Sequence, residues 1–480
     1  MRRYSLLLIT LCAWLLTSAQ SLTNRIDVLL GDALLYAADA SVMVYDLTDG
    51  HMLYEHRADK LCRPASVEKV VTTVAALNRL GTDYELRTSL YVTGTIGPDS
   101  ILQGDLYVVG GFDPEFTSAD LDALIAAIPR AGIRSVTGRI MADVSMADTV
   151  YWGSGWCWDD APASFQPYYS PLLLDKGCVE VRVSPTIKDS VATITCSPAS
   201  AWYEVDNRTV CHNASAGPLR ITRDWQEGSN RIIITGNVEK PQARKLSMQT
   251  SDQHFFTLFT ERLLRNGIGA SDFGYGICPE EAQVIAFVER PIGKVVREAL
   301  KESDNLDAEA LFYHLASADG KPYATAKDAV AKIDTLLTTI HKRYDTQGLA
   351  LQPYKIVDGC GLSNYNMVSA RLLMGILRYA YDKEDIYDMI TESMPRCGID
   401  GTLRNRMGGK EMRERIIAKT GSMTGVSTLA GYAKATNGHT LAFVIMNQQV
   451  MKLSQARAWQ DKVCRAICGV EQCKDFDVSI

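Results

Sequence analysis

The chain has 480 residues, of which 46% are hydrophobic and 22% are charged, a composition typical of a globular protein with two or three domains. It carries 50 basic and 56 acidic side chains, which gives a net charge of −6 at neutral pH. This acidic balance argues against a nucleic-acid partner, because that affinity depends on lysine and arginine side chains that neutralise phosphates.

Residues 1–19 have the features of a secretory signal peptide: a basic start, an apolar run at 6–16 and a small-residue cleavage site at 17–19. The apolar run is shorter than the roughly 20 residues that span a bilayer, so cleavage is favoured over a membrane anchor. A lipid on Cys12 is a weaker alternative, and it would associate the protein loosely with a membrane. We therefore expect an exported protein, either periplasmic or extracellular.

The cysteines point to no metal site. Removal of residues 1–19 would leave 11 of the 12 cysteines, so at least one thiol is unpaired within a monomer. Cys464, Cys468 and Cys473 are candidates for disulfides in an oxidising compartment, although their pairing cannot be read from the sequence. No Cys-x-x-Cys pair occurs and the seven histidines are scattered singly, so we expect neither a metal nor another cofactor.

Two predicted β-hairpins lie near opposite ends of the chain. Strand-like runs at 41–45 and 51–55 flank Asp49-Gly50, and runs at 429–432 and 441–446 flank Asn437-Gly438. Together they predict one antiparallel sheet that is assembled from both ends of the chain.

The residues between these ends predict an inserted region. A strand at 105–109, a helix at 119–131 and a strand at 135–143 form a strand–helix–strand unit, within a module at about 103–185. Short β-type runs, such as 231–235, fill the region from about 185 to 285. The predicted organisation is a signal peptide at 1–19, a main domain split into 20–87 and 286–480, and inserted domains at 88–285.

The first candidate for chemistry is the Ser66-x-x-Lys69 pair. Apolar residues downstream recur at helical spacing, so Ser66 lies at a helix start and shares a face with Lys69, with Cβ atoms about 5–6 Å apart. A serine nucleophile needs such a lysine to remove its proton. A helix cap with a solvated lysine is the structural alternative, and a bare S-x-x-K occurs by chance roughly once or twice in a chain of this length.

Two further motifs make coincidence improbable. Ser303-Asp304-Asn305 precedes a helical run at 306–316, and Lys419-Thr420-Gly421 leads into the strand at 429. Each tripeptide is expected by chance on the order of a tenth of a time at average composition. In the order S-x-x-K, S-D-N, K-T-G they form a signature of serine acyl-transfer enzymes. The split domain that carries all three is therefore the predicted catalytic domain.

With these motifs the chain resembles a class C low-molecular-mass penicillin-binding protein, a family of D-alanyl-D-alanine carboxypeptidases and endopeptidases. Further stretches similar to the family are GDLYVVGG at 104–111, GWCWDD at 155–160, DGCGLS at 358–363 and GTL at 401–403. The resemblance implies an α/β (α+β) fold of the serine β-lactamase/transpeptidase type. Such a fold has an antiparallel sheet flanked by helices, with a large insertion forming one or two extra domains. The 237 residues from Ser66 to Ser303 leave room for it.

The resemblance also implies the roles of the first two motifs. Ser66 would attack the carbonyl of the penultimate D-alanine of a peptidoglycan peptide, with Lys69 as base, and would bind β-lactams covalently. Ser303 and Asn305 would relay a proton to the leaving amine and hold the substrate amide.

The third motif would form the far side of the same site. Lys419 and Thr420 would bind the terminal carboxylate of the substrate, and Gly421 would let its backbone approach. The backbone N–H groups of Ser66 and Ser422 would form the oxyanion hole.

Three other positions bear on the substrate. Asp143 resembles a family aspartate that binds the free amino group of the wall peptide, and a plain loop acid is an equal alternative. The family usually has a serine where this chain has Cys360 and a glycine where it has Phe112, two departures outside the acylation machinery.

Three alternatives remain at this point. A β-lactamase would need a base for deacylation that is not identifiable, and the long insertion argues against it. A β-lactam sensor or wall-binding scaffold would be favoured only by a broken motif, and a hydrolase of small D-amino acid amides is less compatible with the insertion. The preference between carboxypeptidase and endopeptidase action, the third residue of the peptide and the oligomeric state stay open.

Overall fold

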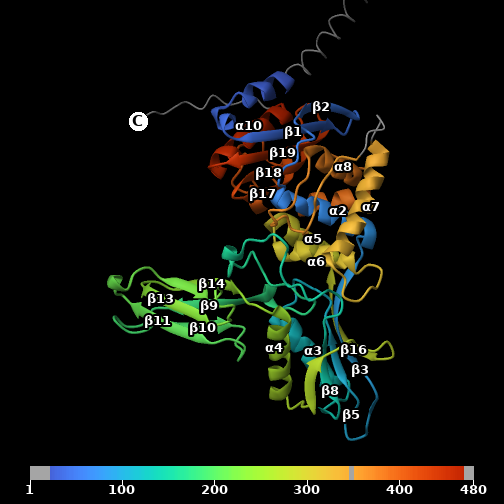
Figure 1. Ribbon diagram of the computed structural model, residues 1–480, viewed down its shortest axis with the longest axis vertical. Coiled ribbons are helices and arrows are strands. Elements are labelled where there is room, and N and C mark those ends of the chain that lie inside the picture. Colours follow the sequence, from blue (N-terminus) through green and yellow to red (C-terminus); the bar gives the residue numbers. More distant parts are fainter. Residues whose placement is uncertain (1–21, 345–350, 470–480) are drawn as a thin grey trace, which may run out of the picture. The chain divides into compact units, whose positions relative to one another are not determined.

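The computed structural model describes residues 22–344 and 351–469, which fold as two compact units (Figure 1). The first unit is built from residues up to 82, 296–304 and from 330 onward, and the second from 83–295 and 305–329. The sequence placed the corresponding breaks at 87/88 and 285/286. It did not anticipate that 305–329 belongs with the inserted residues.

The first unit contains a five-stranded sheet in the order β17-β18-β19-β1-β2, and every neighbouring pair is antiparallel. The strands are β17 (Ile416–Met423), β18 (Gly425–Lys434), β19 (Thr440–Val450), β1 (Asp39–Asp46) and β2 (His51–His56). Strand β1, blue in Figure 1, lies beside the red β19, so both predicted hairpins and the sheet assembled from the two ends of the chain are confirmed.

Helices flank this sheet, as the predicted fold class requires. They are α2 (Glu68–Leu80), α8 (Ala370–Tyr381), α9 (Glu384–Ser393), α10 (Leu453–Cys468) and most of α7 (Ala326–Tyr344). Short helical turns are η1 (Ala33–Tyr36), η2 (Ala65–Val67), η6 (Glu298–Glu302) and η7 (Gly401–Leu403). Trp459 and Val463 of α10 pack with Val44 and Phe443 of the sheet in one buried apolar cluster, whose removal from water stabilises the helix on the strands.

The second unit has a five-stranded sheet of its own, in the order β15-β8-β6-β3-β16. The strands are β3 (Glu85–Val92), β6 (Leu106–Val109), β8 (Arg139–Asp143), β15 (Asp272–Tyr275) and β16 (Gln283–Pro291). β6 and β8 are parallel neighbours joined through α3 (Ser118–Arg130), so the predicted strand–helix–strand unit is confirmed. Apolar side chains of α3 and α4 (Ser251–Arg265) share one buried cluster with this sheet.

Shorter strands make up much of the remaining second unit. One sheet contains β10 (Thr193–Ser197), β9 (Cys178–Ser184) and β14 (Gln242–Ser247), and another contains β11 (Val205–Cys211), β13 (Ile232–Val238) and β12 (Arg220–Arg223). A third is formed by β4 (Thr95–Ile96), β5 (Ile101–Gln103) and β7 (Ser135–Val136). Val181, Ile234 and Leu246 lie in a buried cluster common to the first two sheets, which confirms the β-rich region predicted after 185.

Further helical segments are α5 (Ile292–Arg297), α6 (Asn305–Ala316) and the turns η3 (Trp158–Asp160), η4 (Asp175–Gly177) and η5 (Ala214–Ala216). Across 22–344 and 351–469, no helix has the length and apolar character needed to cross a membrane. The predicted signal peptide, Cys12 and Cys473 lie outside the described residues.

Candidate active site

The predicted nucleophile lies in a tight turn at the start of α2. Ser66 belongs to η2 and is half-buried, and Ala65 before it has a φ of 48°. One helical turn later, the Lys69 side chain is fully buried and its Nζ donates a hydrogen bond of 3.1 Å to Ser66 Oγ. The amine therefore lies within reach of the hydroxyl proton, which is the geometry that a general base requires.

A loop at 358–363 holds this lysine in place. Lys69 Nζ donates to the backbone oxygen of Cys360 at 2.8 Å, and Thr72 Oγ1 donates to the backbone oxygen of Gly359 at 2.7 Å. The Cys360 side chain is buried, and it is the main-chain carbonyl of this residue that contacts the site. The departure from the family serine therefore leaves the contact with the lysine intact.

Asp358 organises that loop. Its carboxylate is buried and accepts hydrogen bonds from the backbone N–H groups of Gly361 at 2.9 Å and Ser363 at 2.7 Å, and from Asn366 Nδ2 at 2.6 Å. Buried backbone donors need such partners, because an unsatisfied one costs about 1–3 kcal/mol. The sequence indicated this stretch only through its similarity to the family, and its part in holding Lys69 was not anticipated.

A second hydroxyl–amine pair, Ser303 and Lys419, lies in the same unit. Ser303 follows η6 with a φ of 65°, and its Oγ accepts a hydrogen bond of 2.7 Å from Lys419 Nζ. The same Nζ donates to the backbone oxygen of Thr420 at 2.8 Å. Burial, together with the nearby charge of Lys69, holds the pKa of Lys419 well below its ordinary value of 10.5.

Strand β17 brings the third motif against the nucleophile turn. A Cβ atom on Gly421 would lie 2.9 Å from the backbone N of Ser66, so only glycine permits this close approach. Thr420 Oγ1 donates to Thr402 Oγ1 of η7 at 2.8 Å. Ser422 pairs with Ser427 across the strands and is exposed. Ser66, Lys69, Ser303, Lys419, Thr420, Gly421 and Ser422 thus belong to one unit, although they come from three separate parts of the chain.

The two remaining predicted site residues belong to the second unit. Asn305 begins α6, and its Nδ2 donates to the backbone oxygen of Phe165 at 2.7 Å. Asp143 ends β8 with a side chain only 4% exposed, and its two oxygens accept from the backbone N–H groups of Ser145 at 2.8 Å and Cys278 at 2.7 Å. These contacts favour a structural role for Asp143 within its own unit.

Phe112 adopts a backbone conformation that suits the glycine expected at this position. Its φ is 43°, in the left-handed region that glycine adopts without strain. The ring is fully buried, and it stacks on Tyr169 with centroids 6.1 Å apart and makes a tilted contact with Tyr313 at 5.7 Å. Such aromatic contacts offset part of the backbone strain.

The predicted disulfides and one group of possible metal ligands can be examined among the described residues. No disulfide joins two of the cysteines in the described ranges, so Cys464 and Cys468 are not bridged to each other, and a bridge to Cys473 falls outside those ranges. Within the first unit, ligand atoms of Asp46, Asp49 and His439 lie within 4.8 Å of one another. There His439 Nδ1 and Asp46 Oδ2 are 2.7 Å apart and join the turns of the two hairpins.

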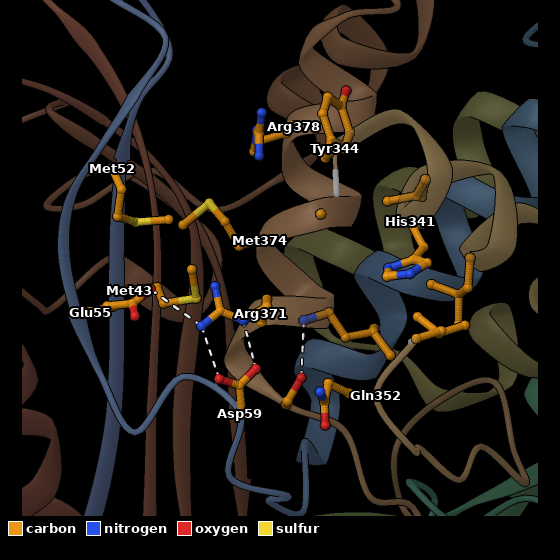
Figure 2. A pocket seen from close by; sticks show the side chains of 16 residues that line it. Met43, Met52, Glu55, Asp59, His341, Tyr344, Gln352, Arg371, Met374 and Arg378 are labelled. Atoms are coloured by element: carbon orange, nitrogen blue, oxygen red, sulfur yellow. Dashed lines mark hydrogen bonds and ion pairs between the residues drawn. The ribbon is translucent and has the colours of Figure 1, made fainter. Parts of the chain in front are cut away.

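The first unit has a cavity of about 370 Å³ between β1, β2, α7 and α8. Figure 2 shows the side chains that line it. Arg371 donates to Asp59 at 2.6 Å within it, and Arg378 lies between the rings of Tyr45 and Tyr344, 4.1 and 4.0 Å from their centroids. None of the predicted site residues lines this cavity, so it is separate from the hydroxyl–lysine pairs.

The chain is similar to known proteins over most of its length. The model of the D-Ala-D-Ala carboxypeptidase 3 (S13) family matches residues 22–466. The chain is 32% identical to a D-alanyl-D-alanine carboxypeptidase of Actinomadura sp., over 89% of this chain and 80% of that protein. It is 24% identical to the D-alanyl-D-alanine carboxypeptidase DacB of Haemophilus influenzae, over 83% of each chain.

The fold is also similar to a solved structure. Penicillin-binding protein 4 of Haemophilus influenzae matches with a TM-score of 0.77 at 24% identity, over 89% of this chain and 95% of that one. The antiparallel sheet flanked by helices, with a large insertion, is therefore the fold of a known penicillin-binding protein, and the predicted fold class is confirmed.

Proposed function

The chain belongs to the D-Ala-D-Ala carboxypeptidase 3 (S13) family. From this premise we propose that it hydrolyses D-alanyl peptide bonds of peptidoglycan peptides through an acyl-enzyme on Ser66, and so removes a terminal D-alanine or cleaves a cross-link. The enzyme is a serine-type D-alanyl-D-alanine carboxypeptidase, a hydrolase of the low-molecular-mass penicillin-binding type. The observation that carries the assignment of residues is the pair of hydroxyl–lysine contacts, Lys69 to Ser66 and Lys419 to Ser303, within one folded unit.

Acylation begins at Ser66. Lys69 Nζ takes the hydroxyl proton as Ser66 Oγ bonds to the carbonyl carbon of the penultimate D-alanine. The Cys360 carbonyl keeps the amine directed at the hydroxyl. The backbone N–H groups of Ser66 and Ser422 stabilise the oxyanion, since β17 passes next to the nucleophile turn at Gly421.

Departure of the terminal D-alanine needs a proton on its nitrogen. Ser303 Oγ, hydrogen-bonded to Lys419 Nζ, is the group that delivers it. A lysine with a depressed pKa suits this relay, because it exchanges a proton near neutral pH more readily than an ordinary lysine. Water then hydrolyses the ester on Ser66 and releases the shortened peptide.

The proposal extends to the location of the enzyme and to cross-linked peptides as substrates. Residues 1–19 direct export to the periplasm or the extracellular space, where peptidoglycan and β-lactams are met. Cross-linked peptides present the same D-alanyl carbonyl as free stems, so D,D-endopeptidase action uses the same residues.

Intact-mass measurement after treatment with benzylpenicillin tests the proposal. One covalent adduct per chain is expected on the wild type and none on Ser66→Ala, because a β-lactam presents a reactive amide and a carboxylate as acyl-D-alanyl-D-alanine does. Thr402→Val, which removes a neighbouring hydroxyl but not the nucleophile, is the matched control and should still be labelled. Labelling of Ser66→Ala would refute the mechanism, and rapid loss of the adduct with many turnovers would indicate a β-lactamase instead.

A further inference from the structure

A carboxypeptidase must recognise the free carboxylate at the end of its substrate, and the predicted cation for that task is poorly placed. The Lys419 side chain is completely buried, and its Nζ donates to Ser303 Oγ and to the Thr420 carbonyl. Burial and the charge of Lys69 also lower its pKa, which favours the neutral amine. A carboxylate outside β17 would therefore gain little from Lys419 directly.

Arg457 offers a guanidinium at this edge of the strand. It lies in the first half of α10 and is exposed, and its Nη2 donates to Ser422 Oγ at 3.1 Å. No carboxylate in the described part of the chain forms an ion pair with it, whereas Asp461, one turn further along α10, is paired with Arg406. Four of the five N–H donors of a guanidinium remain available after one hydrogen bond.

The helix that carries Arg457 is anchored opposite Ser422. Gln460 Nε2, fully buried, donates to the Ser427 carbonyl at 3.0 Å, and Ser427 is the cross-strand partner of Ser422. Ala456 and Trp459, on either side of the arginine, are buried. The backbone at 457 is thus held by packing, which keeps the guanidinium within reach of the end of β17, as its contact with Ser422 shows.

We propose that Arg457 binds the C-terminal carboxylate of the substrate, together with the hydroxyls of Thr420 and Ser422. The planar guanidinium forms paired hydrogen bonds with a carboxylate, which a single hydroxyl cannot. Lys419 then acts through Ser303, and Arg457 on α10 supplies the charge that distinguishes a free terminus from an internal peptide bond. This inference rests on the proposed carboxypeptidase function and names the residue that selects the free terminus.

The test compares two leaving groups on the same acyl donor. Arg457→Gln removes the charge and keeps a hydrogen-bond donor, and kcat/KM is measured for an acyl-D-Ala-D-Ala peptide with a free carboxylate and for its C-terminal amide. We expect a loss of about fivefold to twentyfold for the free acid and less than about twofold for the amide, since only the acid has a charge to bind. Arg457→Lys should recover part of the loss, and Arg465→Gln, eight residues along the same helix, should have no effect.

A second readout does not depend on peptide turnover. Acylation of Ser66 by benzylpenicillin should slow by a similar factor in Arg457→Gln, while acylation by the methyl ester of benzylpenicillin should not. High salt should slow acylation of the wild type more than that of the variant, because exposed charges are screened.

Equal losses on acid and amide, or no loss on either, would overturn the proposal. Its failure is distinct from failure of the proposed function, which would appear as a wild type that neither hydrolyses the peptide nor forms a Ser66 adduct.

Discussion

Replacing Gly361 with alanine tests whether the 358–363 loop positions the catalytic residues. Gly361 has a φ of 80°, and a Cβ built on it would lie 2.0 Å from the backbone oxygen of Ala65, next to the nucleophile. Side-chain Cβ atoms essentially never approach closer than 3.0 Å, so the loop and the nucleophile turn must separate by about 1 Å. The added Cβ would also lie 2.6 Å from the carbonyl carbon of Ala65 and 2.8 Å from the Cβ of Glu68, both below that limit.

Two costs add up for Gly361→Ala. The left-handed conformation costs an alanine about 1–2 kcal/mol, and relieving overlap in a packed region costs roughly 1–3 kcal/mol more. We therefore expect the free energy of unfolding to fall by about 2–5 kcal/mol. A displacement of about 1 Å between reacting groups lowers rates by roughly a hundredfold, and the rate of Ser66 acylation should fall by that order.

Gly438→Ala separates strain from overlap. Gly438 has a φ of 92° in the β18–β19 turn, and a methyl group added there would meet no atom within 4 Å. Its free energy of unfolding should fall only by the cost of the left-handed conformation, about 1–2 kcal/mol, and its acylation rate should equal that of the wild type. Stopped-flow acylation with a chromogenic β-lactam, at a temperature where both variants are folded, measures the difference. A Gly361→Ala enzyme that acylates at the wild-type rate, or a Gly438→Ala enzyme that is equally slow, would refute the reasoning.

Two further predictions concern groups outside the catalytic pairs. The hydrogen bond to Asp46 raises the pKa of His439 above its ordinary value of 6.5, so the stability it contributes is fully present below pH 6.5 and is lost as the pH rises through the folded pKa. Thermal unfolding at several pH values should show this loss in the wild type, and a His439→Gln variant with the same pH profile would contradict it. Asp143→Asn should lower the free energy of unfolding by about 1–3 kcal/mol, because an amide NH2 would face the N–H of Ser145 or Cys278. Unchanged stability with a selective loss on diaminopimelate-containing peptides would instead show that Asp143 binds the ammonium group of the substrate.

The sequence alone determined the reaction class and the outline of the catalytic unit. The three motifs carry their chemistry in residue type and local spacing: Ser66 and Lys69 meet because they are one helical turn apart, and the observed contact of 3.1 Å follows from that spacing. The strands at both ends were readable because their apolar runs and the Asp49-Gly50 and Asn437-Gly438 turns are local signals.

Only the tertiary structure decided which hydrogen-bond partners the motif residues have. Lys419 reaches Ser303 across 116 residues, and Lys69 reaches the Cys360 carbonyl across 291, so no local pattern could indicate either contact. Asp143 looked like a loop acid or a ligand, and its burial with two backbone partners became visible only when β8 was placed in its sheet. Arg457 had no motif at all. Its place beside Ser422 depends on how α10 packs on β18, and packing of distant segments is set by the shape of the whole core, because the contacts that fix it are non-local.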